Sequence, residues 1–234
     1  METLDMGHHI SKRYNEELED IRSRVLAMGG LVEQQLQDAM TSLENQDARL
    51  ATSVIESDFR VNAMEVAIDE ECNLVLARRQ PAARDLRLVV AVIKTITDLE
   101  RIGDEAERIA RMASRLAGEE RVTRLFTQIH SLGQHVRGMV HGALDAFAHL
   151  DTVKAVEVWS EDRSVDREYE SLMRELMTYM MEDPSSIPCV LQAMFAARAI
   201  ERIGDRAGNI CEYVIYLVKG KDVRHTRVDQ QSAT

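Results

Sequence analysis

A pair of acidic residues spaced four positions apart occurs twice in this chain, each time within the same short motif. The motif Glu-Arg-Ile-Gly-Asp begins at Glu100 and again at Glu201, so the second copy follows 101 residues after the first in a chain of 234. Residues four apart lie on the same side of a helix, which brings Glu100 next to Asp104 and Glu201 next to Asp205. Carboxylate oxygens are the ligands that hard cations prefer. The duplicated motif therefore indicates two structural repeats, each with a candidate cation site.

Each copy of the motif also carries features that destabilise a helix. Like charges four residues apart cost a few tenths of a kcal/mol. A glycine inside a helix, here Gly103 or Gly204, costs up to about 1 kcal/mol relative to alanine. A cation between the carboxylates, together with the close approach of a neighbouring helix at the glycine, would offset both costs.

Two carboxylates cannot complete the coordination shell of a hard cation, which takes about six oxygen ligands or more. A facing helix must supply the others. In the first half the candidates are Asp58 and, as a weaker carbonyl ligand, Asn62; in the second half they are Asp162 and Asp166. The sequence leaves open the direction of a further acidic pair, Glu65 and Asp69.

Ordinary ion pairs are the competing explanation for the same carboxylates. Arginines at helical spacing could neutralise them on the surface: Arg101 with Glu105, Arg108 with Asp104, and Arg198 with Glu201. In the second repeat Asn209 stands where the first has Arg108, so Asp205 has no arginine four residues after it. Ion pairing alone therefore accounts less well for the second copy.

The hydrophobic pattern has a helical period almost throughout, with breaks at turn and capping residues. The first stripe, for example, steps by three and four from Leu18 to Met40. The pattern predicts an all-α protein with helices over residues 10–45, 47–79, 81–116, 119–149, 151–182 and 188–219. Short connections make these six long helices antiparallel, giving two tandem, similar three-helix bundles over 10–116 and 119–220, followed by a polar tail at 221–234.

Composition excludes several classes of function. The chain has 29 basic and 40 acidic residues, a net charge of −11, which disfavours nucleic-acid binding. Its three cysteines form no CxxC pair, and no secretory signal or apolar run of about 18 residues is present, so we expect a cytoplasmic protein with no direct membrane insertion. Glycine-rich phosphate loops and nucleophile motifs are absent, so the sequence gives no support for an enzyme.

The chain resembles the PhoU family, accessory proteins of the phosphate-specific transport system. Beyond the two motifs, the likeness to proteobacterial members extends over residues 61–70, 79–81, 85–87, 176–183, 209–212 and 218–220. The resemblance implies a fold of two three-helix bundles and metal binding at E(D)xxxD motifs, which map onto Glu100/Asp104, Glu201/Asp205 and Asp162/Asp166. The fourth position departs from the pattern, because Asn62 follows Asp58 where the family has a second acid. The implied cofactor is a divalent or trivalent cation (Fe, Mn, Mg or Zn).

The resemblance also implies a non-enzymatic role. The expected function is negative regulation of the phosphate-starvation response and modulation of phosphate uptake. The protein would couple the ATPase subunit of a phosphate ABC transporter to a sensor histidine kinase, as a homodimer that reaches the inner membrane only through its partners. Two alternatives stay open: a cytosolic helical scaffold without a metal role, and a carboxylate-bridged metalloenzyme. The latter is disfavoured because no glutamate precedes a histidine by three residues, as di-iron bundles require.

Overall fold

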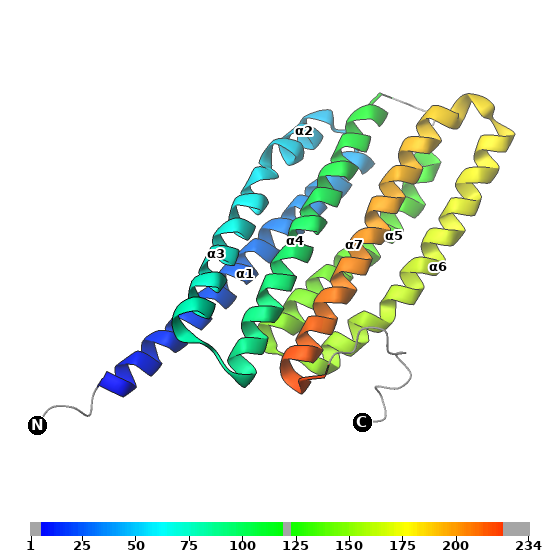
Figure 1. Cartoon of the computed structure of the whole chain (residues 1–234). Helices are drawn as coiled ribbons and strands as arrows, with labels where there is room; N and C mark the ends of the chain where they lie inside the picture. The colour runs from blue at the N-terminus through cyan, green and yellow to red at the C-terminus, as the bar shows by residue number, and fades with distance from the viewer. Residues whose placement is uncertain (1–5, 119–122, 222–234) are drawn as a thin grey trace, which may run out of the picture.

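The computed structural model describes residues 6–118 and 123–221, and this part of the chain is helical without strands. The elements are α1 (Met6–Glu44), α2 (Ala48–Ser57), α3 (Phe59–Arg79), α4 (Ala83–Leu116), α5 (Thr123–His149), α6 (Thr152–Glu182), the short 3-10 helix η2 (Pro184–Ser186) and α7 (Ile187–Lys219). The predicted all-α fold is confirmed. The helix expected over 47–79 is divided at Asp58 into α2 and α3, which follow one another with a bend (Figure 1).

The helix ends coincide with local capping signals. The Asp47 carboxylate accepts hydrogen bonds from the first backbone N–H groups of α2, and Asp151 does the same for α6. At the other end of the chain, Gly220 has a φ of 69°, a left-handed conformation that glycine adopts without strain, and closes α7 with a bond from its N–H to the Tyr216 carbonyl. The expected helix start at 119 and the expected tail beyond 221 lie outside the described residues.

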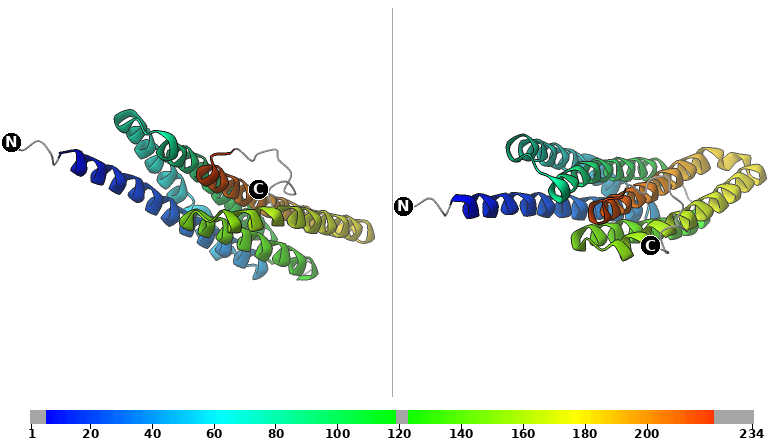
Figure 2. Two further views of the ribbon diagram at one scale, coloured as in Figure 1. Left: turned by 90° about the horizontal axis from the view of Figure 1, so that it is seen from below. Right: turned by 60° about the horizontal axis from the view of Figure 1, so that its bottom comes forward.

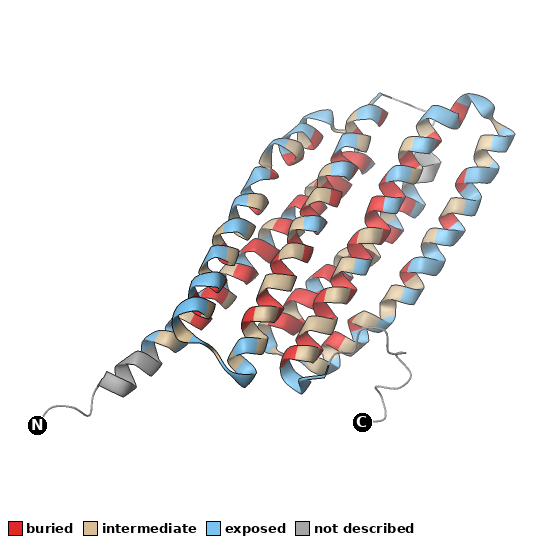
Figure 3. Cartoon of the chain, in the orientation of Figure 1, coloured by how far each residue is buried: buried red, intermediate tan, exposed pale blue. Residues whose placement is uncertain are grey.

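Consecutive long helices run antiparallel, with α2 and α3 together forming one arm, and α4 and α7 lie next to each other in the centre of the molecule (Figures 1 and 2). α1, α2 and α3 pack against α4, while α5 and α6 pack against α7, so each motif helix is the inner member of its own bundle. α1 also contacts α5. The buried side chains of both halves form one continuous core, on the facing sides of the helices (Figure 3). The two bundles therefore share a core rather than forming separate globules.

A polar network joins the two bundles along the α4/α7 contact. The Tyr213 hydroxyl of α7 donates a 2.8 Å hydrogen bond to the buried Asp98 carboxylate of α4, and the Arg206 Nη1 lies 3.5 Å from the other oxygen of Asp98. Two turns further along α4, Glu105 Oε1 accepts a 3.2 Å hydrogen bond from Arg202 Nη1 of α7. Because buried carboxylates are costly without partners, these bonds help to set the register of α4 against α7.

This network changes two of the three expected ion pairs. Arg101 approaches Asp98 (3.7 Å) rather than Glu105, and Arg108 donates to Glu105 (2.7 Å) rather than pairing with Asp104. The third expected pair, Arg198 with Glu201, is confirmed at 2.7 Å. The arginines of α4 thus bond acids that face the second bundle, which leaves Asp104 without the ion pair that the spacing suggested.

None of the helices in the described part of the chain combines the length and the apolar character that crossing a membrane requires.

Candidate metal centre

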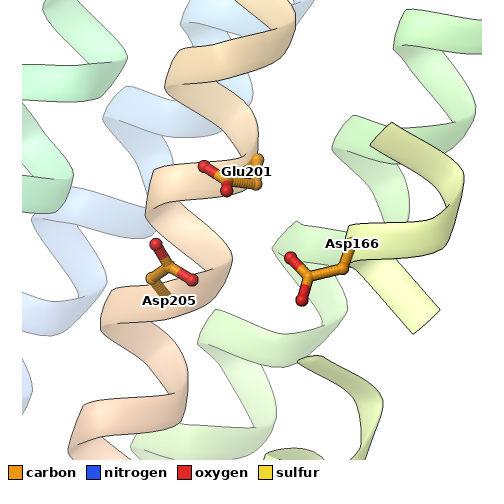
Figure 4. Close-up of side chains that lie close together, drawn as sticks. All are labelled: Asp166, Glu201 and Asp205. Carbon is orange, nitrogen blue, oxygen red and sulfur yellow. The ribbon is translucent and has the colours of Figure 1, made fainter. Parts of the chain in front are cut away.

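The second-half motif places three carboxylates together between two helices. Glu201 and Asp205 lie one turn apart on α7, and Asp166 reaches toward them from α6 (Figure 4). One oxygen from each of the three lies within 4.8 Å of the others, and among the described histidines, cysteines and acids this is the one group of three with that spacing. Three oxygens at this spacing can share one cation.

The glycine of the motif lets the facing helices approach α7. A Cβ atom at Gly204 would lie 3.4 Å from Val165 Cγ1 of α6 and 3.5 Å from Val136 Cγ2 of α5. Both are ordinary van der Waals distances, so a single methyl group is the most that this space holds. Val165 precedes Asp166 directly, and the close packing at Gly204 therefore also positions the Asp166 backbone beside the acid pair of α7.

Glu201 is the most buried member of the group, with 7% of its surface exposed. Its Oε1 accepts a 2.7 Å hydrogen bond from Arg198, but its Oε2 is buried and accepts no hydrogen bond from the described residues. Burial first, and then the nearby charges of Asp205 and Asp166, raise the pKa of Glu201 to about 6, against the opposing effects of Arg198 and Arg202. A buried carboxylate oxygen without a donor is a position that a cation would satisfy.

Asp162 lies one turn before Asp166 on α6, outside the tight group of three. Burial raises its pKa to about 6, with contributions from the charges of Asp205 and Asp166. The pKa of Asp205 is also raised, first by burial and then by Asp166. The structure thus gathers the four predicted second-half acids into one strongly anionic region, in which Asp162 is a candidate for an additional or water-mediated ligand.

In the corresponding region of the first half, amides bond the Asp58 carboxylate, while the buried amide oxygens Gln35 Oε1 and Asn62 Oδ1 accept no hydrogen bond from the described residues. Asp58 is buried, and both of its carboxylate oxygens accept hydrogen bonds from amides: Gln35 Nε2 of α1 donates to Oδ1 at 2.8 Å, and Asn62 Nδ2 donates to Oδ2 at 3.2 Å. Sequence reasoning missed Gln35. The sequence signal for Gln35 was its spacing: it follows Val32 by three residues and Met28 by seven, which places a polar side chain on the apolar stripe of the first helix.

The other first-half acids lie near Asp58 but do not form a group of three within 4.8 Å. Burial raises the pKa values of Glu100 and Asp104, and the charges of neighbouring acids add to this effect. Glu65, whose direction the sequence left open, belongs to this region, because its charge acts on Glu100 and its own raised pKa is due mainly to burial. The first half is therefore anionic but more dispersed.

Comparison of the two halves explains why the second is better suited to a cation. A Cβ at Gly103 would meet Gln35 and Val61, whereas a Cβ at Gly204 would meet Val165, Val136 and, at 3.9 Å, Met139. Met139 follows Gln35 by the same 104 residues that separate Asp162 from Asp58, and it offers no N–H donor. In the same way Asp166 stands at the position of Asn62, so a negatively charged carboxylate replaces an amide that donates a hydrogen bond. The second half thus has two fewer amide side chains and one more acid at these positions, and Arg198 is the positive partner that the chain supplies to Glu201.

The raised pKa values predict a pH dependence in chelator-treated protein. In the unfolded chain Asp162 and Glu201 titrate near 3.8 and 4.5, but in the fold only near 6. At pH values between the unfolded and folded pKa values, the folded state binds more protons than the unfolded state. The stability that this protonation contributes is fully present below the unfolded pKa values and is lost as the pH rises through about 6. We expect the unfolding free energy to fall by on the order of 2 kcal/mol between pH 4.5 and 7.

Urea denaturation in a chelator at the two pH values measures this change. The double variant Asp162→Asn with Glu201→Gln removes the two groups with the pKa values near 6 and is expected to reduce the slope of the profile. An unchanged slope in the double variant would assign the pH dependence to other residues.

Comparison with known proteins identifies the family. The family model described as the PhoU domain matches residues 25–113 and 129–214, one match in each half. The chain is 56% identical over 225 residues to the phosphate-specific transport system accessory protein PhoU of Serratia marcescens, covering 96% of this chain and 92% of that protein. It is 54% identical over 230 residues to the protein of the same name from Escherichia coli strain K12, covering 98% and 95%.

Two crystal structures have the same architecture. PhoU from Pseudomonas aeruginosa superposes with a TM-score of 0.87 at 53% identity, covering 89% of this chain and all of that one. The phosphate transport system regulatory protein PhoU from Streptococcus pneumoniae superposes with a TM-score of 0.83 at 30% identity, covering 90% and 99%. These relatives are named as accessory or regulatory proteins rather than as enzymes. With a PhoU domain in each half and close relatives matched over nearly their whole length, the chain belongs to the PhoU family.

Proposed function

We propose that this protein is a non-enzymatic accessory protein of a phosphate transporter and a negative regulator of the phosphate-starvation response. The observation that carries the proposal is the match over nearly the whole length to relatives named accessory proteins of the phosphate-specific transport system. In this role it couples the ATPase subunit of the transporter to a sensor histidine kinase and modulates phosphate uptake. It acts in the cytoplasm as a homodimer and reaches the inner membrane through its partners.

The architecture suits coupling by binding. Helices of up to 39 residues present long, ordered surfaces on both bundles, and the shared core with its α4/α7 polar network holds those surfaces at a fixed relation. A partner bound to one bundle can therefore constrain the position of a partner bound to the other. Such coupling needs no covalent step by the protein itself.

We further propose that Asp166, Glu201 and Asp205, with Asp162 nearby, hold a divalent or trivalent cation. The orphaned Oε2 of Glu201 and the spacing of the three carboxylates support this assignment. When bound, the cation would neutralise the acids and link α6 to α7. Glu100, Asp104 and Asp58 make a weaker first-half site, since amides already occupy both oxygens of Asp58.

Gene deletion tests the regulatory role directly. We expect a deletion strain to express a phosphate-starvation reporter, such as secreted alkaline phosphatase, constitutively in phosphate-rich medium, and the wild-type gene in trans to restore repression. The control is a strain that carries the empty vector. Normal repression in the deletion strain, with no second copy of the gene in the genome, would contradict the proposal.

A further inference from the structure

The first turns of α7 expose a stripe of large apolar side chains. Ile187 and Leu191 are each 40% exposed and Phe195 is 57% exposed. Because they are spaced four residues apart, the three lie on one side of the helix and define the α7 stripe. Met177 and Met181, on the last turns of α6, are exposed at the same end of the α6–α7 hairpin. Exposed aromatic and methionine side chains are typical of protein-binding surfaces.

The first repeat shows that the fold does not require large apolar residues at the positions of Phe195, Met177 and Met181. With the offset of 101 residues between the motif helices, Phe195 corresponds to Lys94, whose ammonium group lies over the rings of Tyr213 and Tyr216 at 5.4 and 5.8 Å. With the offset of 104 between Asp58 and Asp162, Met177 corresponds to Asn73 and Met181 to Ala77. The positions of Phe195, Met177 and Met181 thus hold charged, polar or small residues in the first half, whereas those of Ile187 and Leu191 hold the apolar residues Leu86 and Val90.

Positive charge borders the α7 stripe. Arg198 continues the exposed side of α7 by one turn beyond Phe195, and Arg115 of α4 lies beside the stripe, donating to Gln192 at 3.3 Å. The Arg198 guanidinium is half-exposed, whereas its partner Glu201 is buried. This surface therefore presents cationic groups to solvent although the whole chain has a net charge of −11.

We propose that the α7 stripe docks an amphipathic helix of a partner protein, with apolar side chains against Leu191 and Phe195 and acidic side chains toward Arg115 and Arg198. The stripe spans nine residues, about 12 Å, which matches the i, i+4, i+7 anchors of one helix face. The charge complementarity favours an acidic partner segment over a second copy of this surface, which would place arginines opposite arginines. This inference rests on the proposed coupling role, because it identifies the surface that one of the two partners uses.

Binding measurements with two purified probes test the proposal: the ATPase subunit of the phosphate transporter and the cytoplasmic portion of the sensor kinase, both from the same organism. Phe195→Lys copies the residue of the first repeat and is expected to weaken binding of one probe by about tenfold or more, as loss of a central aromatic anchor does. Arg115→Glu is expected to weaken binding of the same probe and to reduce the salt dependence of that binding. The matched control is Val153→Lys, which changes a 68% exposed apolar residue at the other end of the same bundle.

The outcomes separate this proposal from the proposed function. If both probes bind Phe195→Lys as they bind wild type, the docking surface is refuted while the coupling role stands. If wild-type protein binds neither probe, the coupling role and the docking surface both fail. Sedimentation measures the oligomeric state of wild type and of each variant. If wild type is a dimer and Phe195→Lys is a monomer, a second copy of the chain covers the α7 stripe and the proposal is wrong.

Discussion

Replacement of Gly204 by leucine is expected to destabilise the protein by about 2–3 kcal/mol, the cost of forcing a large side chain into a packed core. A Cβ alone would already be in van der Waals contact with Val165 and Val136, so the three further carbon atoms of leucine must displace α6 or α5 from α7. The shift would also move Asp166 away from Glu201 and Asp205. Urea denaturation followed by circular dichroism measures the change in free energy.

Two glycine variants distinguish packing from helix propensity. Gly204→Ala adds only the methyl group that the space accepts, and its stability is expected to stay within about 1 kcal/mol of wild type. Gly138→Leu makes the same change as Gly204→Leu at a position of α5 where a Cβ would meet nothing within 4 Å, and it should leave the protein as stable or slightly more stable. A Gly204→Leu protein with the wild-type urea midpoint would show that the helices do not pack closely at the motif.

The double variant Glu201→Ala with Asp205→Ala is expected to lose the second-half cation. These residues supply two of the three carboxylates that converge between α6 and α7, and Asp166 alone cannot hold a hard cation. We expect metal content after dialysis against Mn²⁺ or Fe²⁺, measured by elemental analysis, to fall by at least one equivalent per chain. We also expect added cation to raise the melting temperature of wild-type protein and not that of the variant.

Variants of other acids make this result specific. Glu100→Ala with Asp104→Ala removes the first-half pair, and it should reduce metal content less, because the amides of Gln35 and Asn62 already satisfy Asp58. Asp20→Ala changes an exposed acid of α1 and should alter neither metal content nor melting temperature. Equal metal content in the Glu201/Asp205 variant and in wild type would remove the cation assignment, and the scaffold without a metal role would then be the better explanation of the fold.

The two halves thus use one helical framework with different local chemistry. In the first half, amide donors from the chain itself balance the buried aspartate. In the second half, methionine and aspartate replace those donors, and an unbalanced group of acids results. The same divergence occurs on the surface, where Phe195 stands at the position of Lys94. The second bundle therefore differs from the first both at its group of acids and on its surface.

The helices themselves could be predicted from the sequence because the forces that define them are local. A stripe such as Leu18 to Met40 repeats with the helical period, and Asp47 and Asp151 bond backbone groups two and three residues away. The pairing of Glu201 with Asp205 likewise follows from the helix alone, since residues four apart always share one side. The break at Asp58 was not visible, because Asp58 has helical dihedral angles and no proline or glycine marks it.

The contacts between helices were decided only by the tertiary structure. Which acid of α6 meets the α7 pair depends on how closely the helices approach at Gly204, and a shift of one turn would exchange Asp166 for Asp162. Gln35 reaches Asp58 across 23 residues of sequence, and Tyr213 reaches Asp98 across 115. Such bonds depend on the register and depth of packing between long helices, which are set by the shape of the whole core rather than by the spacing of residues along one helix.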